Sequence, residues 1–140
     1  MKSRTPDIVR RGLLTALIVA VAVPAIPQEA GTMVRVTFDG DHGSRTFENA
    51  IDGFNDVSYV VAMRAGQSLQ VSLGSNNISN CFDLYAPGAT KPSYIGGDSG
   101  STHRMLAKTA GDYVVKVFLL RLAARDNQSA QYSLELTLTN

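Results

Sequence analysis

Two arginines four residues apart are the clearest candidates for chemistry in this chain. Arg121 and Arg125 stand in segment 119–127, which joins two strongly apolar runs without the Gly or Pro of an ordinary tight hairpin. Their spacing places both guanidinium groups on one side of the segment, where they can donate paired hydrogen bonds to the carboxylates of an acidic cleft. The alternative is that Arg121 pairs with Asp126 or another local acid on a solvated surface, where an ion pair is worth roughly 0–1 kcal/mol.

Residue types that usually carry catalysis or bind metals are scattered along the chain. His42 and His103 are the only histidines, and neither lies in a short metal-binding spacing. Asp52 and Asp56 could bind Ca²⁺ or hold a loop, but two carboxylates four residues apart are a weak pattern. The glycine-rich segment 96–101 lacks the lysine of a phosphate-binding loop and is read as a flexible loop. We therefore expect a protein that is not an enzyme and that has no cofactor and no metal site.

Residues 1–25 have the pattern of a secretory signal peptide. Four basic residues precede an uncharged, mostly apolar run at 12–23, and the small side chains around Ala25 suit cleavage after that residue. The apolar run is shorter than the roughly twenty residues that a membrane span needs. We expect export, cleavage and a soluble mature domain of residues 26–140, with an uncleaved membrane anchor as the alternative.

Composition limits what the mature domain can be. Residues 1–25 hold four basic side chains and one acidic one, so their removal changes the formal charge from +1 to −2. That charge argues against a nucleic-acid partner, which requires a clearly basic face. The remaining length suits one domain with a real core. Cys81 is the only cysteine, so we expect it to be buried as a small apolar residue, with pairing to another chain as the alternative.

Alternation of apolar and polar residues dominates the chain after residue 33, as in strands with one face toward a core. We expect strands near 34–38, 44–48, 57–63, 68–73, 81–85, 103–107, 113–120 and 132–138. This pattern predicts an all-β fold, an antiparallel β-sandwich of about eight strands.

Three expectations concern how these strands are arranged. The first two should form an opening hairpin, strands 57–63 and 68–73 should pair antiparallel across a turn, and strand 113–120, apolar on both faces, should be central in its sheet. A long loop at 86–102 should be functional or mobile.

Three segments of the mature chain resemble sequences of one known family. They are 59–71 (YVVAMRAGQSLQV), 82–88 (FDLYAPG) and 111–132, which contains the motif R-x-A-A-R at 121–125 between two strands. The family is that of the periplasmic inhibitors of g-type (goose-type) lysozyme in Gram-negative bacteria. The resemblance spans nearly the whole mature chain, and R-x-A-A-R is its most specific motif.

The resemblance implies a periplasmic protein inhibitor that plugs the substrate cleft of g-type lysozyme and so protects bacterial peptidoglycan. The implied partner-binding residues are Arg121, Arg125, Leu122, Asn127 and Tyr59. For Tyr59, which falls on the apolar stripe of strand 57–63, core packing is an equal alternative. Family members often carry a second basic residue after the motif, where this chain has Asp126, a substitution that lowers the local positive potential.

Two other functions remain as alternatives. A stand-alone module that resembles the pre-peptidase C-terminal β-sandwiches would bind cell-wall polysaccharide or another exported protein. The chain has no Trp, and its five Tyr lie mostly in strand patterns, so no platform for stacking sugars is evident. A hydrolase whose site is assembled from distant residues is the third hypothesis.

Overall fold

The structure, a computed structural model, describes residues 31–140. The expected signal peptide, 1–25, and its cleavage site at Ala25 lie outside the described residues. Within 31–140, nine strands and two short helices form the fold: β1 (Thr32–Val36), β2 (Gly43–Asp52), β3 (Val57–Met63), β4 (Ser68–Ser75), β5 (Asn80–Tyr85), β6 (Tyr94–Ile95), α1 (Gly96–Ser99), β7 (Thr102–Leu106), β8 (Gly111–Leu119), α2 (Arg121–Arg125) and β9 (Ser129–Thr139). No helix in this part of the chain is long and apolar enough to cross a membrane.

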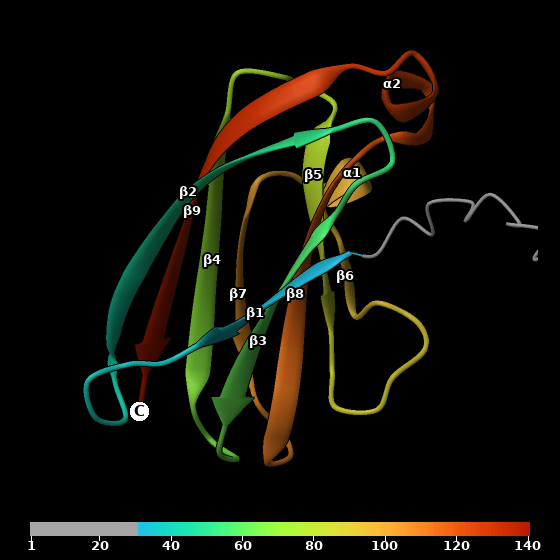
Figure 1. Ribbon diagram of the computed structural model, residues 1–140. Helices are drawn as coiled ribbons and strands as arrows, with labels where there is room; N and C mark the ends of the chain where they lie inside the picture. The colour runs from blue at the N-terminus through green and yellow to red at the C-terminus, as the bar shows by residue number, and fades with distance from the viewer. Residues whose placement is uncertain (1–30) are drawn as a thin grey trace, which may run out of the picture.

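The strands form two sheets that face each other (Figure 1). One sheet has five strands in the order β1-β3-β8-β5-β6, and the other has four in the order β2-β9-β4-β7. Alternate side chains of both sheets point into a shared core, as in β9, where Tyr132, Leu134, Leu136 and Leu138 are all buried. The expected β-sandwich is confirmed, and β8 is central between β3 and β5, as its apolar sequence predicted.

The expected opening hairpin is wrong. β1 pairs parallel with β3, with Val36 opposite Val61, whereas β2 pairs antiparallel with β9 over its full ten residues in the other sheet. The segment between β1 and β2 therefore crosses from one sheet to the other. β2 runs well beyond the expected 44–48, so its backbone finds far more hydrogen-bond partners along β9, an eleven-residue strand, than along the five-residue β1.

The expected pairing of strands 57–63 and 68–73 is also wrong. The turn between them carries the chain between the sheets, because β3 pairs with β1 and β8 while β4 pairs with β7 and β9. The buried side chain of Gln67 holds this turn: its Oε1 accepts from Arg64 N–H (2.7 Å) and its Nε2 donates to Asp41 O (2.9 Å). Gln67 N–H still donates to Arg64 O (3.2 Å), while the side-chain amide takes the return bond from Arg64 N–H that the backbone of a hairpin would have accepted.

Two local expectations also need correction. Cys81 is half-exposed on the outer face of β5 and not buried, because its neighbour Phe82 takes the inward position of the alternation. The expected long loop contains β6 and α1, which fold back onto β5. At Gly96 any Cβ would overlap the backbone of Phe82, so only glycine allows this close approach.

Candidate functional site

The two arginines lie on α2, a short turn of helix that joins β8 and β9 at one end of the sandwich (Figure 1). Arg121, Leu122 and Arg125 are exposed, while Ala123 and Ala124 are buried at 4% and 3% exposure. The spacing of four residues places both guanidinium groups on one side of the turn. The small alanines let the turn sit close to the sandwich while the arginines point outward.

Asn127 ends this turn. Its φ of 55° is left-handed, which Asn tolerates better than most residues, and it is the only non-glycine residue among 31–140 with a positive φ. Asn127 N–H donates to Ala124 O (3.0 Å) and Gln128 N–H donates to Ala123 O (3.0 Å). These two bonds form a Schellman motif, which satisfies the last carbonyls of the helix. The side chain of Asn127 is exposed, while its backbone ends the helix.

Two neighbouring loops fix the position of α2. Gly53 N–H, between β2 and β3, donates to Gln128 O (2.9 Å). A Cβ at Gly53 would lie 3.0 Å from Asn127 Oδ1, so the two loops approach closely. Between β4 and β5, Ser79 O accepts from Leu120 N–H (2.8 Å). We call the three loops 53–55, 76–79 and 120–128 together the α2 end.

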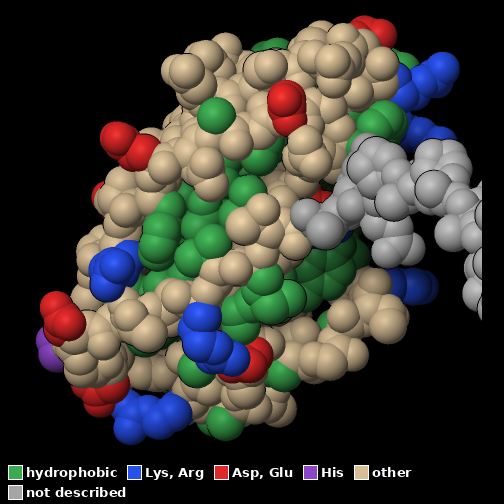
Figure 2. All heavy atoms as spheres, viewed as in Figure 1, with side chains coloured by type: hydrophobic (Ala, Val, Ile, Leu, Met, Phe, Trp, Pro, Cys, Tyr) green, Lys and Arg blue, Asp and Glu red, His purple; other side chains and the backbone are tan. Residues whose placement is uncertain are grey.

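Neither arginine of α2 belongs to any of the ion pairs among residues 31–140. Those pairs are Arg35–Asp112, His42–Asp41, Arg64–Asp41 and Lys116–Asp56. The alternative in which Arg121 is neutralised by Asp126 is therefore not what the structure shows. Figure 2 shows Lys and Arg side chains beside a hydrophobic one at the upper right, where Figure 1 places α2.

Tyr59 is a core residue and not a surface contact, which corrects the implied partner-binding role. It is 1% exposed, its hydroxyl lies 2.7 Å from the hydroxyl of Tyr132, and its ring centroid is 5.0 Å from that of Phe47. Burial and this hydrogen bond raise the pKa of Tyr132. The apolar stripe of β3 points inward, so core packing, the second reading of Tyr59, is the one observed.

The other residues that could carry chemistry are dispersed. His103 stacks on Tyr94, with 3.9 Å between ring centroids, and burial lowers its pKa. Asp52 accepts from Asn55 Nδ2 (2.7 Å) and holds a turn, while Asp56 pairs with Lys116 (3.3 Å). Within residues 31–140, no group of three or more His, Cys, Asp or Glu side chains is placed to hold a metal ion.

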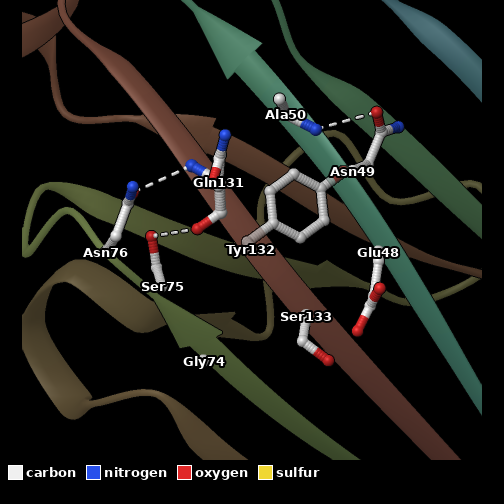
Figure 3. Close-up of a pocket in the computed structure, with 9 residues that line it drawn as sticks. All are labelled: Glu48, Asn49, Ala50, Gly74, Ser75, Asn76, Gln131, Tyr132 and Ser133. Carbon is white, nitrogen blue, oxygen red and sulfur yellow. Dashed lines mark hydrogen bonds between the residues drawn. The ribbon is translucent and has the colours of Figure 1, made fainter.

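A polar groove of about 700 Å³ crosses the four-stranded sheet next to loop 76–79. It is lined by Glu48, Asn49, Ala50, Gly74, Ser75, Asn76, Gln131, Tyr132 and Ser133 (Figure 3). The amide oxygens of Asn49 and Asn76 are bonded to neighbouring backbone: Asn49 Oδ1 accepts from Ala50 N–H (2.8 Å) and Asn76 Oδ1 from Gln131 N–H (2.9 Å). The groove offers hydrogen-bonding groups but no nucleophile with an adjacent base.

Three exposed apolar residues of the α2 end were missed from the sequence: Phe54, Ile78 and Leu120, which are 47%, 99% and 38% exposed. Their signal was a bulky apolar side chain inside a turn-rich segment, as in Gly53-Phe54-Asn55 and Asn77-Ile78-Ser79. Turn residues are usually polar, so an apolar residue there points either to the core or to a contact with another molecule.

Comparison with solved structures finds proteins of the same architecture. No family model matches the chain, and no curated protein matches it in sequence. Three similar structures are periplasmic inhibitors of g-type lysozyme. The one from Aeromonas hydrophila has a TM-score of 0.67 and 24% identity and covers 77% of this chain and 96% of its own. The one from Salmonella Typhimurium has a TM-score of 0.62 and 26% identity and covers 78% of this chain and 99% of its own.

The third, a mutant of the Escherichia coli inhibitor, has a TM-score of 0.61 and 25% identity and covers 79% of this chain and 100% of its own. The resemblance to this family that the sequence indicated is thereby confirmed in three dimensions. The pre-peptidase C-terminal domain of a Bacillus anthracis collagenase has a TM-score of 0.54 and 16% identity over 78% of this chain and 94% of its own, which is a likeness of fold alone.

Proposed function

We propose that this chain acts as the periplasmic g-type lysozyme inhibitors do, whose architecture it shares, and that it is a binding protein and not an enzyme. The observation that carries the proposal is the pair Arg121 and Arg125, exposed on a fixed turn and outside every ion pair of the described residues. The similarity to inhibitors of 25% and 26% identity over almost their full length supports it.

The mechanism is occlusion of the substrate cleft. A cleft that cleaves glycans concentrates carboxylates, because these enzymes work with paired acidic residues. Two guanidinium groups on one helical turn complement that field and can donate bidentate hydrogen bonds to the carboxylates. The Schellman motif and the bonds to Gly53 and Ser79 hold the turn before binding, so little conformational entropy is lost when the complex forms. Asp126, exposed beside Arg125, weakens the local positive charge but leaves it net positive.

The expected location follows from the same proposal. The signal peptide of residues 1–25 would deliver the chain to the periplasm, where it would meet a lysozyme that attacks peptidoglycan. The formal charge of −2 after cleavage does not oppose binding to an acidic cleft, because complementarity at an interface is local.

An inhibition assay tests this function. The exported, processed chain should suppress lysis of peptidoglycan by a g-type lysozyme at a ratio near one to one. The double variant Arg121→Glu/Arg125→Glu should lose inhibition, because it places two negative charges against the carboxylates of the cleft. Arg104→Glu/Lys108→Glu is the matched control, since both side chains are exposed and neither lies at the α2 end.

Two results would contradict the proposal. The first is a double variant that inhibits as well as the unmodified chain, which would remove the arginines from the mechanism. The second is an unmodified chain that leaves g-type lysozyme fully active. Parallel assays on c-type and i-type enzymes define the class of the target.

The polar groove of the four-stranded sheet favours one alternative, a stand-alone binder of cell-wall polysaccharide. Its amide, hydroxyl and carboxylate groups could hydrogen-bond sugar hydroxyls. Sedimentation of the processed chain with insoluble peptidoglycan in the absence of lysozyme separates the two functions. Binding there, together with no inhibition, would favour this alternative.

A further inference from the structure

Exposed apolar side chains lie on α2 and on the two loops that are bonded to the segment carrying the two arginines. Residues 31–140 expose seven large hydrophobic side chains, and four of them belong to the α2 end. We call these four the apolar collar: Phe54, Ile78, Leu120 and Leu122. The other three are Met33, Ile95 and Leu106. Single exposed apolar residues are normal on a protein surface, but a group of them marks a contact site.

The collar comes from three separate loops that are fixed to one another. Phe54 follows Gly53, whose N–H is bonded to Gln128 O, and Ile78 precedes Ser79, whose carbonyl accepts from Leu120 N–H. Asn77 Nδ2 donates to Gln128 Oε1 and to Ser129 O, both at 3.0 Å. Leu120 also lies against α1, since a Cβ at Gly97 would be 3.1 Å from Leu120 Cδ2. The collar is therefore ordered before any partner binds.

Arginines and apolar side chains contribute differently to a protein complex. Charges at an exposed rim mainly steer association and fix orientation, and their effect falls with salt. Residence time depends largely on side chains that lose their water in the complex. Arg121 and Arg125 alone would give an oriented but short-lived complex, whereas Leu122, which belongs to the same helical turn and is 73% exposed, adds apolar area.

We propose that the apolar collar and the two arginines form one contact surface, and that the collar packs against the apolar walls of the lysozyme's substrate cleft. This inference rests on the proposed function. Ligand clefts are lined mainly by apolar and aromatic side chains with a few polar groups. Such a lining matches a surface that combines two exposed cations with exposed apolar residues on adjoining loops. The collar then sets how long the complex lasts, and the arginines set how fast and in which orientation it forms.

The test measures association and dissociation rates of the processed chain with a g-type lysozyme at low and high salt. Phe54→Ser/Ile78→Ser should dissociate about tenfold faster or more, as expected for the loss of apolar anchors at an interface, with unchanged salt dependence. Arg121→Gln/Arg125→Gln should associate more slowly and lose much of the salt dependence. Leu106→Ser is the matched control, because Leu106 is 60% exposed on β7 and away from the α2 end; it should keep both rates.

The outcomes distinguish this inference from the proposed function. If the collar variant keeps the dissociation rate of the unmodified chain while the arginine variant binds poorly, the collar has no role and inhibition by the arginines stands. If the unmodified chain does not bind the lysozyme, the proposed function fails and the inference fails with it. Ile78→Ser alone guards against misfolding, because a side chain that is 99% exposed contributes nothing to the core; it should still speed dissociation.

Discussion

The two alanines of α2 determine how the flanking arginines are presented. Ala123 and Ala124 are buried where the turn meets the sandwich, and their carbonyls accept the bonds of the Schellman motif. A larger side chain at either position would push the turn outward and disturb those bonds. The alanines of R-x-A-A-R thus fix the position of the turn, and the arginines provide its positive charge.

Replacing one of these alanines should move the turn while both arginine charges remain. Ala124→Leu adds volume to a buried position and should lower the free energy of unfolding by about 1–3 kcal/mol. Inhibition should weaken although both arginines remain. Thermal unfolding and the lysis assay measure the two effects, and Leu122→Ala, which changes an exposed residue, should leave stability almost unchanged. An Ala124→Leu variant that inhibits normally would show that the placement of the turn is unimportant.

A variant of Tyr59 tests whether this residue acts in the hydrophobic core or in partner binding. Tyr59→Phe removes the 2.7 Å bond between the hydroxyls of Tyr59 and Tyr132 and takes a partner from a buried polar group, which costs about 1–3 kcal/mol. We expect a lower denaturant midpoint with inhibition unchanged at temperatures where the variant is folded. A loss of inhibition without a loss of stability would mean that Tyr59 acts at the interface after all.

Cys81 should be a sluggish nucleophile. Partial burial raises the pKa of its thiol, and the nearby Asp83 carboxylate raises it further. Because the thiolate is the reactive form, alkylation at neutral pH should be slower than for a free cysteine in an unfolded peptide and should accelerate as the pH rises. Asp83→Asn should increase the rate by removing the negative charge. Equal rates in the folded and unfolded chain would contradict this expectation.

Among the elements, alternation in the sequence located most strands but not their partners. The stripes of β3, β4 and β9 appear in the sequence as they appear in the structure, because a period of two reports only which face is buried. Pairing depends on where the turns send the chain. The side chain of Gln67 holds the turn before β4 through bonds to Arg64 and Asp41. Asp41 is distant in the sequence, so no local pattern predicts the bond to it.

An aromatic contact connects the two sheets. His103 on β7 stacks on Tyr94 of β6, and these strands belong to different sheets. Because burial lowers the pKa of His103 below its ordinary 6.5 in the folded state, the unfolded chain binds this proton more tightly. The stability contributed by neutral His103 is complete above pH 6.5 and is lost as the pH falls through 6.5 toward the folded pKa.

The measurement is the denaturant midpoint as a function of pH for the unmodified chain and for His103→Gln. The unmodified chain should lose stability from pH 7 to pH 5 more steeply than the variant, which has no imidazole at this position. Thr102→Ser is the control, because Thr102 is an exposed, uncharged neighbour on β7 and its replacement should keep the slope of the unmodified chain. Identical slopes in all three proteins would mean that His103 takes up its proton equally well in both states.

At the scale of the whole molecule, the candidate site was only half visible in the sequence. The arginines were found because their spacing, and the absence of Gly and Pro from the connection that carries them, are local properties of residues 119–127. Phe54 and Ile78 were not found, because their exposure beside α2 depends on three loops meeting at one end of the sandwich. Tyr59 was left open between two roles because an alternating strand does not say whether an aromatic residue on the buried stripe reaches the surface.

The hydrogen bonds that join α2 to two other loops limit how this site could be reproduced outside the protein. A synthetic peptide of residues 119–129 would keep both guanidinium groups but would lose Gly53 and Ser79, which bond to it from outside that segment. Five helical residues do not hold their shape in isolation, so such a peptide should be a poor mimic. Transplanting the proposed contact surface onto another scaffold would require all three loops in their native spacing.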